Sequence, residues 1–186
     1  MDSVGLTEKE NLFSMIPFYK KAKQKGIKPI LGCEVNVCLQ SYANNQLYKS
    51  HNKNLDSHHL LLLVTNQIGY LNLIKLVSIS YIEGFDFKPK IDKTLLKKYN
   101  EGLIATSACL SGEINSSIVK RDYSHAKTIA IEYKQIFKDR FYLEMQNHNL
   151  PEELATHKTL HKLSKELSIP LVATNDTHYI HEEDAE

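Results

Sequence analysis

The sequence has few cysteines and no long apolar segment. Its 186 residues include three cysteines, an odd number without a Cys-x-x-Cys pair, which argues against a disulfide framework and a zinc ribbon. No apolar run approaches the roughly 20 residues that a transmembrane helix needs, so we expect no membrane span. The N-terminus lacks the basic start, apolar centre and small-residue cleavage site of a secretory signal. A cytoplasmic protein is therefore expected.

The sequence also lacks an excess of either charge. Its 23 Lys and Arg residues against 22 Asp and Glu give a net charge of +1, which provides no overall attraction to nucleic acid. The one basic cluster, within residues 20–28, is expected to be the solvated face of a helix. We find no internal repeat, low-complexity tract or second domain. With 42% apolar residues, the chain (1–186) is expected to form one domain around one core.

Short apolar segments alternate with helical patterns along the chain. Strands are predicted at 28–39, 59–65, 102–109, 140–145 and 169–176, and helices at 12–25, 69–84, 123–138 and from Pro151, with a connector and short helix at 88–99. Residues 40–57 are interpreted as a loop or small hairpin. Because 59–65 is apolar throughout, we predict a parallel strand that is buried on both faces. The alternation is typical of an α/β domain, either a barrel or an open sheet.

Apolar spacing also predicts which helix faces are buried. The predicted buried stripes are Leu12, Met15, Ile16, Tyr19 and Ala22; Leu71, Ile74, Val77 and Tyr81; Ala126, Ile129, Tyr133, Ile136 and Phe137; and Leu154, Leu160, Leu163 and Leu167. Pro17 fits the first of these helices if Ser14 is its N-cap, because the first turn has no intrahelical acceptor for an N–H.

Ligand-type side chains follow the ends of four predicted strands. They are Glu34, Cys109, the pair Glu144 and His148, and the pair Asp176 and His178. The carboxyl ends of parallel strands meet at one rim, so we expect these side chains to lie together. Carboxylates and imidazoles of this kind hold divalent ions that polarise phosphates and activate water.

Each of these residues also has a simpler explanation. Asp176 has the position of a helix cap, Cys109 that of a small buried apolar residue, and Glu34 that of an ion-pair partner. His59 stands at the start of its predicted strand, so the strand-end rule does not place it at the rim. Spacing alone does not choose between a metal site and these structural roles.

Five segments, read in order, resemble the PHP (polymerase and histidinol phosphatase) domain of bacterial DNA polymerase III alpha subunits. They are residues 11–35, 58–78, 87–113, 141–153 and 169–179, which include ILGCEV, HHLLLLV, LIATSAC, FYLEM and VATNDTH. They favour the polymerase branch over histidinol phosphatases. The resemblance implies a distorted seven-stranded, TIM-like α/β barrel with two or three divalent ions at its strand ends. It implies ligand positions for Glu34, His59, Cys109, Asp176 and His178, and places Glu144 and His148 behind the ligands or at the rim.

Two departures from the family pattern weaken the expected metal site. The resemblance implies an opening strand with a His-x-His pair, then a helix and a strand that ends in Thr-Asp-His-Gly-Asn. This chain begins near VGLTEKEN, with Glu8, Lys9 and Glu10 at the Asp-His-Gly positions. A lysine ammonium repels the cation that an imidazole would bind. We expect an incomplete domain without its first strand-helix unit, and a divalent ion (Zn, Mn or Mg) that is weakened or lost.

Three functions are compatible with the sequence. The first is a mainly structural module of a replicase, joined to the rest of the alpha subunit and in contact with a proofreading exonuclease subunit. In that case the DNA polymerase activity and the DNA contacts belong to the parent subunit, whose palm this chain lacks. The second is a metal-dependent phosphoesterase or 3′–5′ exonuclease. The third is a non-catalytic binding module, so the sequence leaves open whether the chain is itself an enzyme.

Overall fold

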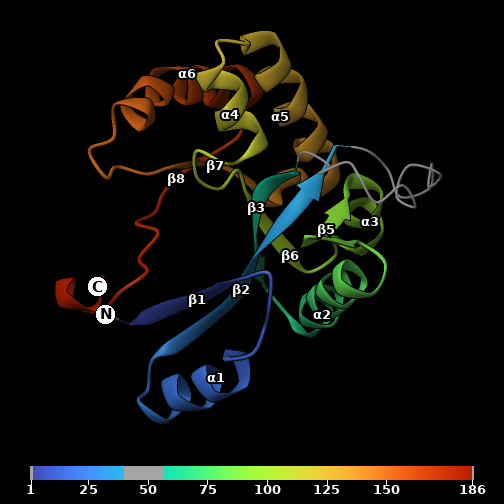
Figure 1. Cartoon of the computed structure of the whole chain (residues 1–186), viewed down its shortest axis with the longest axis vertical. Helices are drawn as coiled ribbons and strands as arrows, with labels where there is room; N and C mark the ends of the chain where they lie inside the picture. The colour runs from blue at the N-terminus through green and yellow to red at the C-terminus, as the bar shows by residue number, and fades with distance from the viewer. Residues whose placement is uncertain (1, 40–56, 186) are drawn as a thin grey trace.

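The computed structural model describes residues 2–39 and 57–185 and shows a mixed α/β architecture (Figure 1). The strands are β1 (Ser3–Lys9), β2 (Lys28–Cys38), β3 (Ser57–Val64), β4 (Phe85–Asp86), β5 (Lys88–Asp92), β6 (Leu103–Thr106), β7 (Phe141–Met145) and β8 (Leu171–Ala173). The helices are α1 (Met15–Gln24), α2 (Gln67–Ile82), α3 (Lys93–Tyr99), α4 (Glu113–Val119), α5 (Tyr123–Phe137) and α6 (Pro151–Leu167). Short 3-10 helices follow at Lys138–Arg140 and Glu182–Ala185. The predicted loop or hairpin at 40–57 falls almost wholly outside the described residues.

The strands form one curled, incomplete barrel, which confirms the predicted fold class. Their order is β4-β5-β2-β3-β6-β7-β8, and β1 pairs with β2. Both β1 and β5 lie on the same edge of β2, one after the other, because Lys9 is in register with Glu34 and Lys90 with Asn36. In Figure 1, α4, α5 and α6 gather near β7 and β8, whereas α1 lies with β1 at the opposite end. Within the described ranges, β8 pairs only with β7, so the sheet does not close on itself.

Strand β3 is antiparallel to both of its neighbours, so the prediction of a parallel strand is wrong. It pairs with β2 through Asn36 and His59, and with β6 through Leu61 and Thr106. Its burial is also one-sided, since Leu60 and Leu62 are buried and the residues between and after them are half-buried. A short apolar run has the same pattern in either direction, and therefore the sequence did not encode its orientation. As a consequence, the start of β3 lies beside the carboxyl-terminal half of β2.

Helix α1 begins at the position expected if Ser14 is its N-cap, although the Ser14 side chain makes no capping hydrogen bond. It starts directly after Ser14, and Pro17 lies in the first turn, where its missing N–H costs no intrahelical bond. Gly26 follows the helix with a φ of 71°, a left-handed conformation that suits glycine. Met15 and Ala22 are the buried side chains of the helix.

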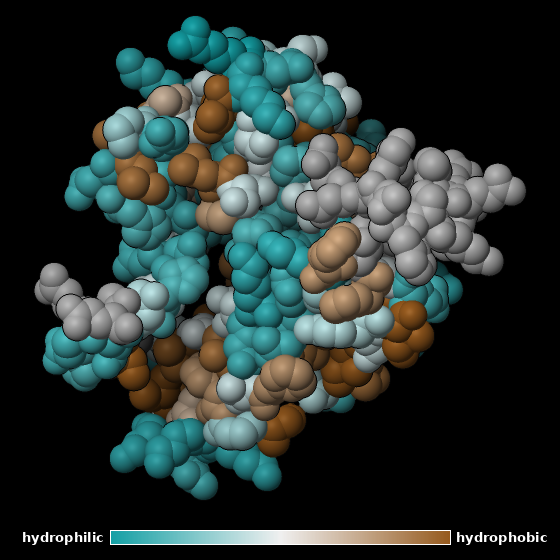
Figure 2. All heavy atoms as spheres, in the orientation of Figure 1, coloured by the Kyte–Doolittle hydropathy of each residue, from teal (hydrophilic) through white to brown (hydrophobic). Residues whose placement is uncertain are grey.

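Two residues of the predicted α1 stripe are exposed and Leu12 is half-buried against the core, which corrects the sequence interpretation. Ile16 and Tyr19 are 49% and 43% exposed, and both line a cavity of about 470 Å³ together with Leu31, Val64 and Tyr70. Figure 2 shows apolar residues in the lower part of this face, where α1 and α2 lie. The helix therefore contacts the sheet through a narrower stripe than its sequence pattern suggests.

The other predicted stripes had mixed outcomes. On α2 the buried residues are Gly69, Leu73, Leu76, Val77 and Ser80, while Leu71 and Tyr81 are exposed, contrary to prediction. This helix is apolar on nearly all sides, so periodicity could not select the buried face. The α5 stripe is confirmed in full. On α6, Leu160 and Leu163 are buried but Leu154 is 52% exposed. In the part of the chain that the structure describes, no helix is long and apolar enough to cross a membrane.

The turn between β6 and α4 depends on Gly112. The Gly112 N–H donates to the Cys109 carbonyl over 2.9 Å, and the Asn115 amide donates to the carbonyls of Ala108 and Cys109 over 3.2 and 3.1 Å. A Cβ at Gly112 would lie 2.0 Å from the Ser107 carbonyl oxygen. Only glycine allows this close approach of two backbone segments, and the approach fixes the position of Cys109.

We predict that Gly112→Ala lowers the free energy of unfolding by about 1–3 kcal/mol, because the turn must shift to admit the methyl group. The measurement is urea denaturation followed by circular dichroism. Gly5→Ala is the matched control, since its added carbon would meet its nearest atom, the Ile30 carbonyl oxygen, at 4.0 Å. The control should change stability by less than about 1 kcal/mol. Equal stability of the two variants would contradict this account of the turn.

Candidate metal centre

Three potential ligands converge where β2, β3 and the β6–α4 turn meet. Glu34, His59 and Cys109 each offer one ligand atom, and these atoms lie within 4.8 Å of one another. Glu34 is on β2 and His59 is near the start of the antiparallel β3, so the β2–β3 ladder brings them together. Cys109 follows β6, and a backbone bridge between His59 and Gly112 holds its turn against β3. All three side chains are half-buried.

Glu34 is surrounded by positive partners. The His59 Nδ1 lies 3.0 Å from the Glu34 Oε1, and the Lys9 Nζ lies 3.4 Å from the same oxygen. Burial acts to raise the pKa of the Glu34 carboxyl, but His59 and Lys9 outweigh it and hold this pKa below its usual value. Glu34 is therefore a stable anion at neutral pH, as a metal ligand must be.

The contacts of His59 argue against a nucleophilic Cys-His-Glu relay. A relay needs the thiol on one ring nitrogen and the carboxylate on the other. Here the Cys109 Sγ lies 3.5 Å from His59 Nδ1, the same nitrogen that contacts Glu34. The contacts with Cys109 and Glu34 raise the pKa of His59 to about 9, against the opposing effect of burial. Oxygen, nitrogen and sulfur atoms that converge on one point are instead the pattern of a metal centre.

The donor set fits one metal ion and does not fit a pair. One carboxylate, one imidazole and one thiolate match the three protein ligands of an open zinc-type site, which leaves one coordination position for water or a phosphate oxygen. A two-ion site needs a second set of ligands about 3.5–4 Å away. Among the described residues, Glu34, His59 and Cys109 form the one group of three or more His, Cys, Asp or Glu residues with this proximity.

Asp176 and His178 lie outside this group. They follow β8 by three and five residues, in a segment that leaves the sheet (Figure 1). Their side chains are 40% and 70% exposed and contact each other, with His178 Nε2 3.5 Å from Asp176 Oδ1. The structure thus assembles three of the five predicted ligands and leaves these two apart from them. Strand-end position alone does not fix the path of the chain beyond the strand.

Glu144 is buried on β7 and is held by neutral donors. Its carboxylate accepts hydrogen bonds from the hydroxyls of Thr106 and Thr174 and, over 2.9 Å, from the Gln146 amide. Its backbone N–H donates to the Ser107 hydroxyl over 2.8 Å. These hydrogen bonds link β6, β7 and Thr174, the residue that follows β8.

His148 links three segments at the rim. Its Nδ1 lies 2.7 Å from Glu153 Oε1 on α6, and its Nε2 lies 2.6 Å from the Asn175 carbonyl oxygen beyond β8. Both ring nitrogens thus face acceptors, which favours the doubly protonated cation. Glu153 and the Asn175 carbonyl raise the pKa of His148. Burial acts to raise the pKa of Glu153, but the hydrogen bonds from His148 outweigh it and the pKa is lowered.

Glu153 was not predicted from the sequence as part of this rim. The available signal was its place in the first turn of the helix that Pro151 begins, five residues after His148. An acidic residue there stabilises the positive end of the helix dipole. The Glu153 carboxylate also accepts the His148 backbone N–H over 2.6 Å. One carboxylate therefore binds both the backbone and the side chain of His148 and holds the β7–α6 loop.

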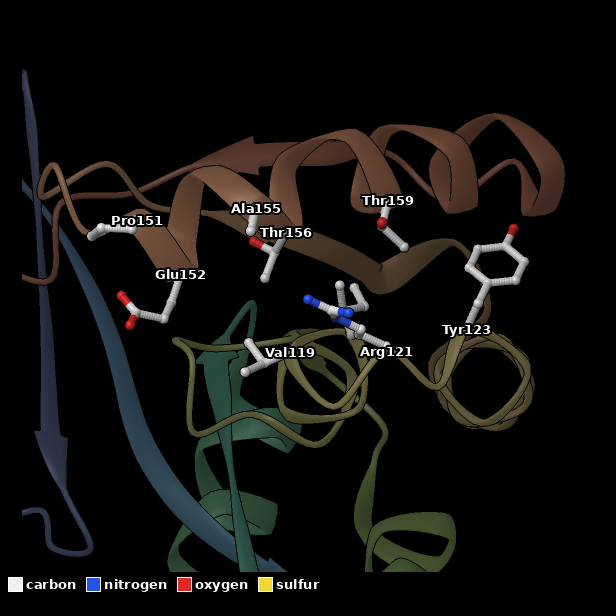
Figure 3. A pocket seen from close by; sticks show the side chains of 9 residues that line it. Val119, Arg121, Tyr123, Pro151, Glu152, Ala155, Thr156 and Thr159 are labelled. Atoms are coloured by element: carbon white, nitrogen blue, oxygen red, sulfur yellow. The ribbon is translucent and has the colours of Figure 1, made fainter.

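A separate cavity of about 520 Å³ lies between α6 and the α4–α5 turn (Figure 3). Arg121 and Thr156 extend into it, and Val119 and Ala155 form part of its apolar lining. None of the predicted ligands lines this cavity. The Glu34–His59–Cys109 cluster is therefore separate from this cavity.

We predict a pH-dependent contribution of the His148–Glu153 pair to stability. The contribution of His148 is present below its unfolded pKa of about 6.5 and is lost as the pH rises through its higher folded pKa. The contribution of Glu153 to stability is present above its unfolded pKa of about 4.3 and is lost as the pH falls through its lowered folded pKa. His148→Ala should therefore lower the free energy of unfolding most between about pH 4.3 and 6.5. The loss should be less than about 1 kcal/mol, because the imidazole is 40% exposed.

The measurement is thermal unfolding across pH 3–9. His125→Ala is the control, because His125 is exposed at the start of α5. A stability difference between wild type and His148→Ala that does not vary with pH would refute the pairing.

Comparison with known proteins agrees with this architecture. A family model described as "PHP domain" matches residues 1–148. Over its whole length the chain is 45% identical to the DNA polymerase III subunit alpha of Borreliella burgdorferi and 40% identical to that of Helicobacter pylori. It is 40% identical to the Thermus aquaticus subunit over 98% of its length. The chain spans 15–16% of the length of these relatives. The chain therefore belongs to the PHP domain family.

Proposed function

We propose that the chain is the PHP-domain segment of a replicative DNA polymerase III alpha subunit and that its main role there is structural. The observation that carries this proposal is that similarity to such subunits extends along the whole chain while the metal-type cluster is reduced to three ligands. In this role, residues 1–186 act as one incomplete PHP domain. Pairing of β8 with β7 supports this, because it joins residues beyond the family match to the same sheet.

The partners follow from this role. The first is the remainder of the alpha subunit, to which DNA polymerisation belongs, and DNA is reached only through that remainder. A proofreading exonuclease subunit is a further proposed partner. A near-zero net charge is consistent with a domain that does not itself bind DNA. The proposed location is the cytoplasm, where a bacterial replicase works.

The proposed metal is a single, weakly held divalent ion on Glu34, His59 and Cys109. A thiolate and an imidazole favour Zn²⁺ over Mg²⁺, and Mn²⁺ is intermediate. When bound, such an ion supplies a Lewis acid and an activated water. Asp176 and His178 remain proposed ligands, supported by their place after the carboxyl end of β8. Their exposed side chains would have to leave each other to reach the cluster.

If the role is structural, a large-to-small substitution in the core of this segment should reduce the heat resistance of the parent polymerase. Ile129→Ala, in an alpha subunit that carries this segment, should remove about 2–5 kcal/mol of domain stability, because Ile129 is 2% exposed. Ile131→Ala on the same helix is the matched control, since Ile131 is 37% exposed. The measurement is polymerase activity that remains after graded heating. Equal losses in the two variants would contradict a structural contribution of this core.

A second candidate function, phosphoester hydrolysis, is favoured by the convergence of three ligands, but we predict no useful turnover. A single ion forfeits several kcal/mol of transition-state stabilisation relative to two ions, and about 1.36 kcal/mol is a factor of ten in rate. The assay incubates the chain with Mn²⁺, Zn²⁺ or Mg²⁺ and either a phosphomonoester or a labelled 3′ end. Asp176→Ala and His59→Gln are the controls. Turnover that disappears in these controls would establish the second function.

A further inference from the structure

The Glu34–His59–Cys109 cluster has a lysine ammonium beside it, that of Lys9. Lys9 is the last residue of β1, and the parallel β1–β2 ladder sets it in register with Glu34. Residues paired in this way project from the same face of a sheet. The Lys9 Nζ consequently lies 3.4 Å from Glu34 Oε1, the oxygen that also contacts His59. One carboxylate oxygen is thus shared by an ammonium and an imidazole.

The two acidic neighbours of Lys9 are held by other parts of the fold. The Glu8 carboxylate accepts the Ser14 backbone N–H over 2.9 Å at the start of α1. The Glu10 carboxylate accepts the Asn36 amide over 2.6 Å, and Glu10 adopts a φ of 65° that turns the chain after β1. Both carboxylates therefore stabilise the junction of β1, β2 and α1. Within the described part of the chain, the ion pair of the Lys9 ammonium is with Glu34 and not with either of these carboxylates.

We propose that Lys9 is the resident cation of this site and takes the charge-balancing place of a divalent ion. This inference rests on the proposed metal-type nature of the cluster and identifies what controls its occupancy. A zinc–oxygen bond is about 2.1 Å long, so an ion on Glu34 Oε1 would lie within about 5.5 Å of the ammonium nitrogen. Like charges at that separation repel strongly in a half-buried site. An ion can bind only when Lys9 moves aside.

The surface position of Lys9 makes this exclusion partial. Its side chain is 51% exposed, whereas that of Glu34 is 18% exposed. The flexible lysine can therefore swing into water, which weakens ion binding without abolishing it. A further consequence is that the cluster is neutralised without metal, so a chelator should not destabilise the wild-type fold.

The test compares Co²⁺ binding by wild type, Lys9→Met and Lys9→Arg in the full chain, followed by the thiolate-to-cobalt absorption that ligation by Cys109 produces. We expect Lys9→Met to bind Co²⁺ at least tenfold more tightly than wild type. Lys9→Arg keeps the charge and should resemble wild type. Lys20→Met removes an exposed lysine of α1 and controls for net charge. Lys9→Gln replaces Lys9→Met if circular dichroism shows that the methionine variant is not folded.

Each outcome separates the Lys9 proposal from the metal site itself. Tight binding by Lys9→Met that disappears on adding Cys109→Ser supports both. Equally tight binding by wild type and Lys9→Met, with the same absorption, overturns the role of Lys9 but keeps the metal site. Binding by neither protein overturns both. If Lys20→Met gains as much Co²⁺ affinity as Lys9→Met, the effect is due to net charge, and the role of Lys9 is overturned.

The second readout is thermal stability. In chelator, Lys9→Met should melt below wild type, because Glu34 has lost a partner, and Zn²⁺ should restore the difference. Zn²⁺ should leave the melting of wild type nearly unchanged. A variant that melts as wild type does in chelator, and does not respond to Zn²⁺, would count against Lys9 as the resident cation.

Discussion

The antiparallel ladder between β2 and β3 is the constraint on which the candidate centre depends. It places His59 opposite Asn36, which is two residues beyond Glu34. The start of β3 and the carboxyl-terminal half of β2 therefore lie at the same end of the sheet. The His59 N–H then donates to the Ser111 carbonyl over 3.1 Å, which holds the turn that carries Cys109. A parallel β3 would put its first residues at the opposite end of the sheet. The cluster is therefore a product of strand direction as much as of ligand identity.

Most of the ligands in the candidate centre could be predicted from the sequence, some from strand-end position and one from family resemblance alone. Strand-end position led to Glu34 and Cys109, and the structure brings these two together. His59 came only from family resemblance, because strand-end logic assumed a parallel strand and therefore put His59 at the wrong end. Asp176 and His178 satisfied the same logic, yet the structure leaves them apart. What the sequence did not contain was the direction of the backbone after β8, which Asp176 turns with a φ of 47°.

The buried face of a helix was predictable where the apolar residues repeat at helical spacing on one side of it. Helix α5 has most of its apolar residues on one side, and that side is the buried one, whereas Ile131 is exposed. Helix α2 is apolar nearly all round, so its sequence fits several orientations and the packing of β3 and β5 selects one. Helix α4 was not predicted, since seven residues with a polar composition give little periodicity. Its position depends on contacts that only the folded chain supplies, among them the hydrogen bond of the Tyr133 hydroxyl to Glu113 over 3.0 Å.

The shared edge of β2 has a consequence for motion. Because β1 and β5 occupy successive halves of that edge, β1 can detach while β2 keeps its ladders with β3 and β5. Native proteins open in such sub-global units, each with its own free energy, and the amides of a detached unit exchange their hydrogens before those of the core. Lys9 would leave together with β1, so each opening of this strand would briefly release Glu34 from its ammonium partner. Ions would then have two routes to the centre, the swing of the exposed Lys9 side chain and the slower opening of one edge strand.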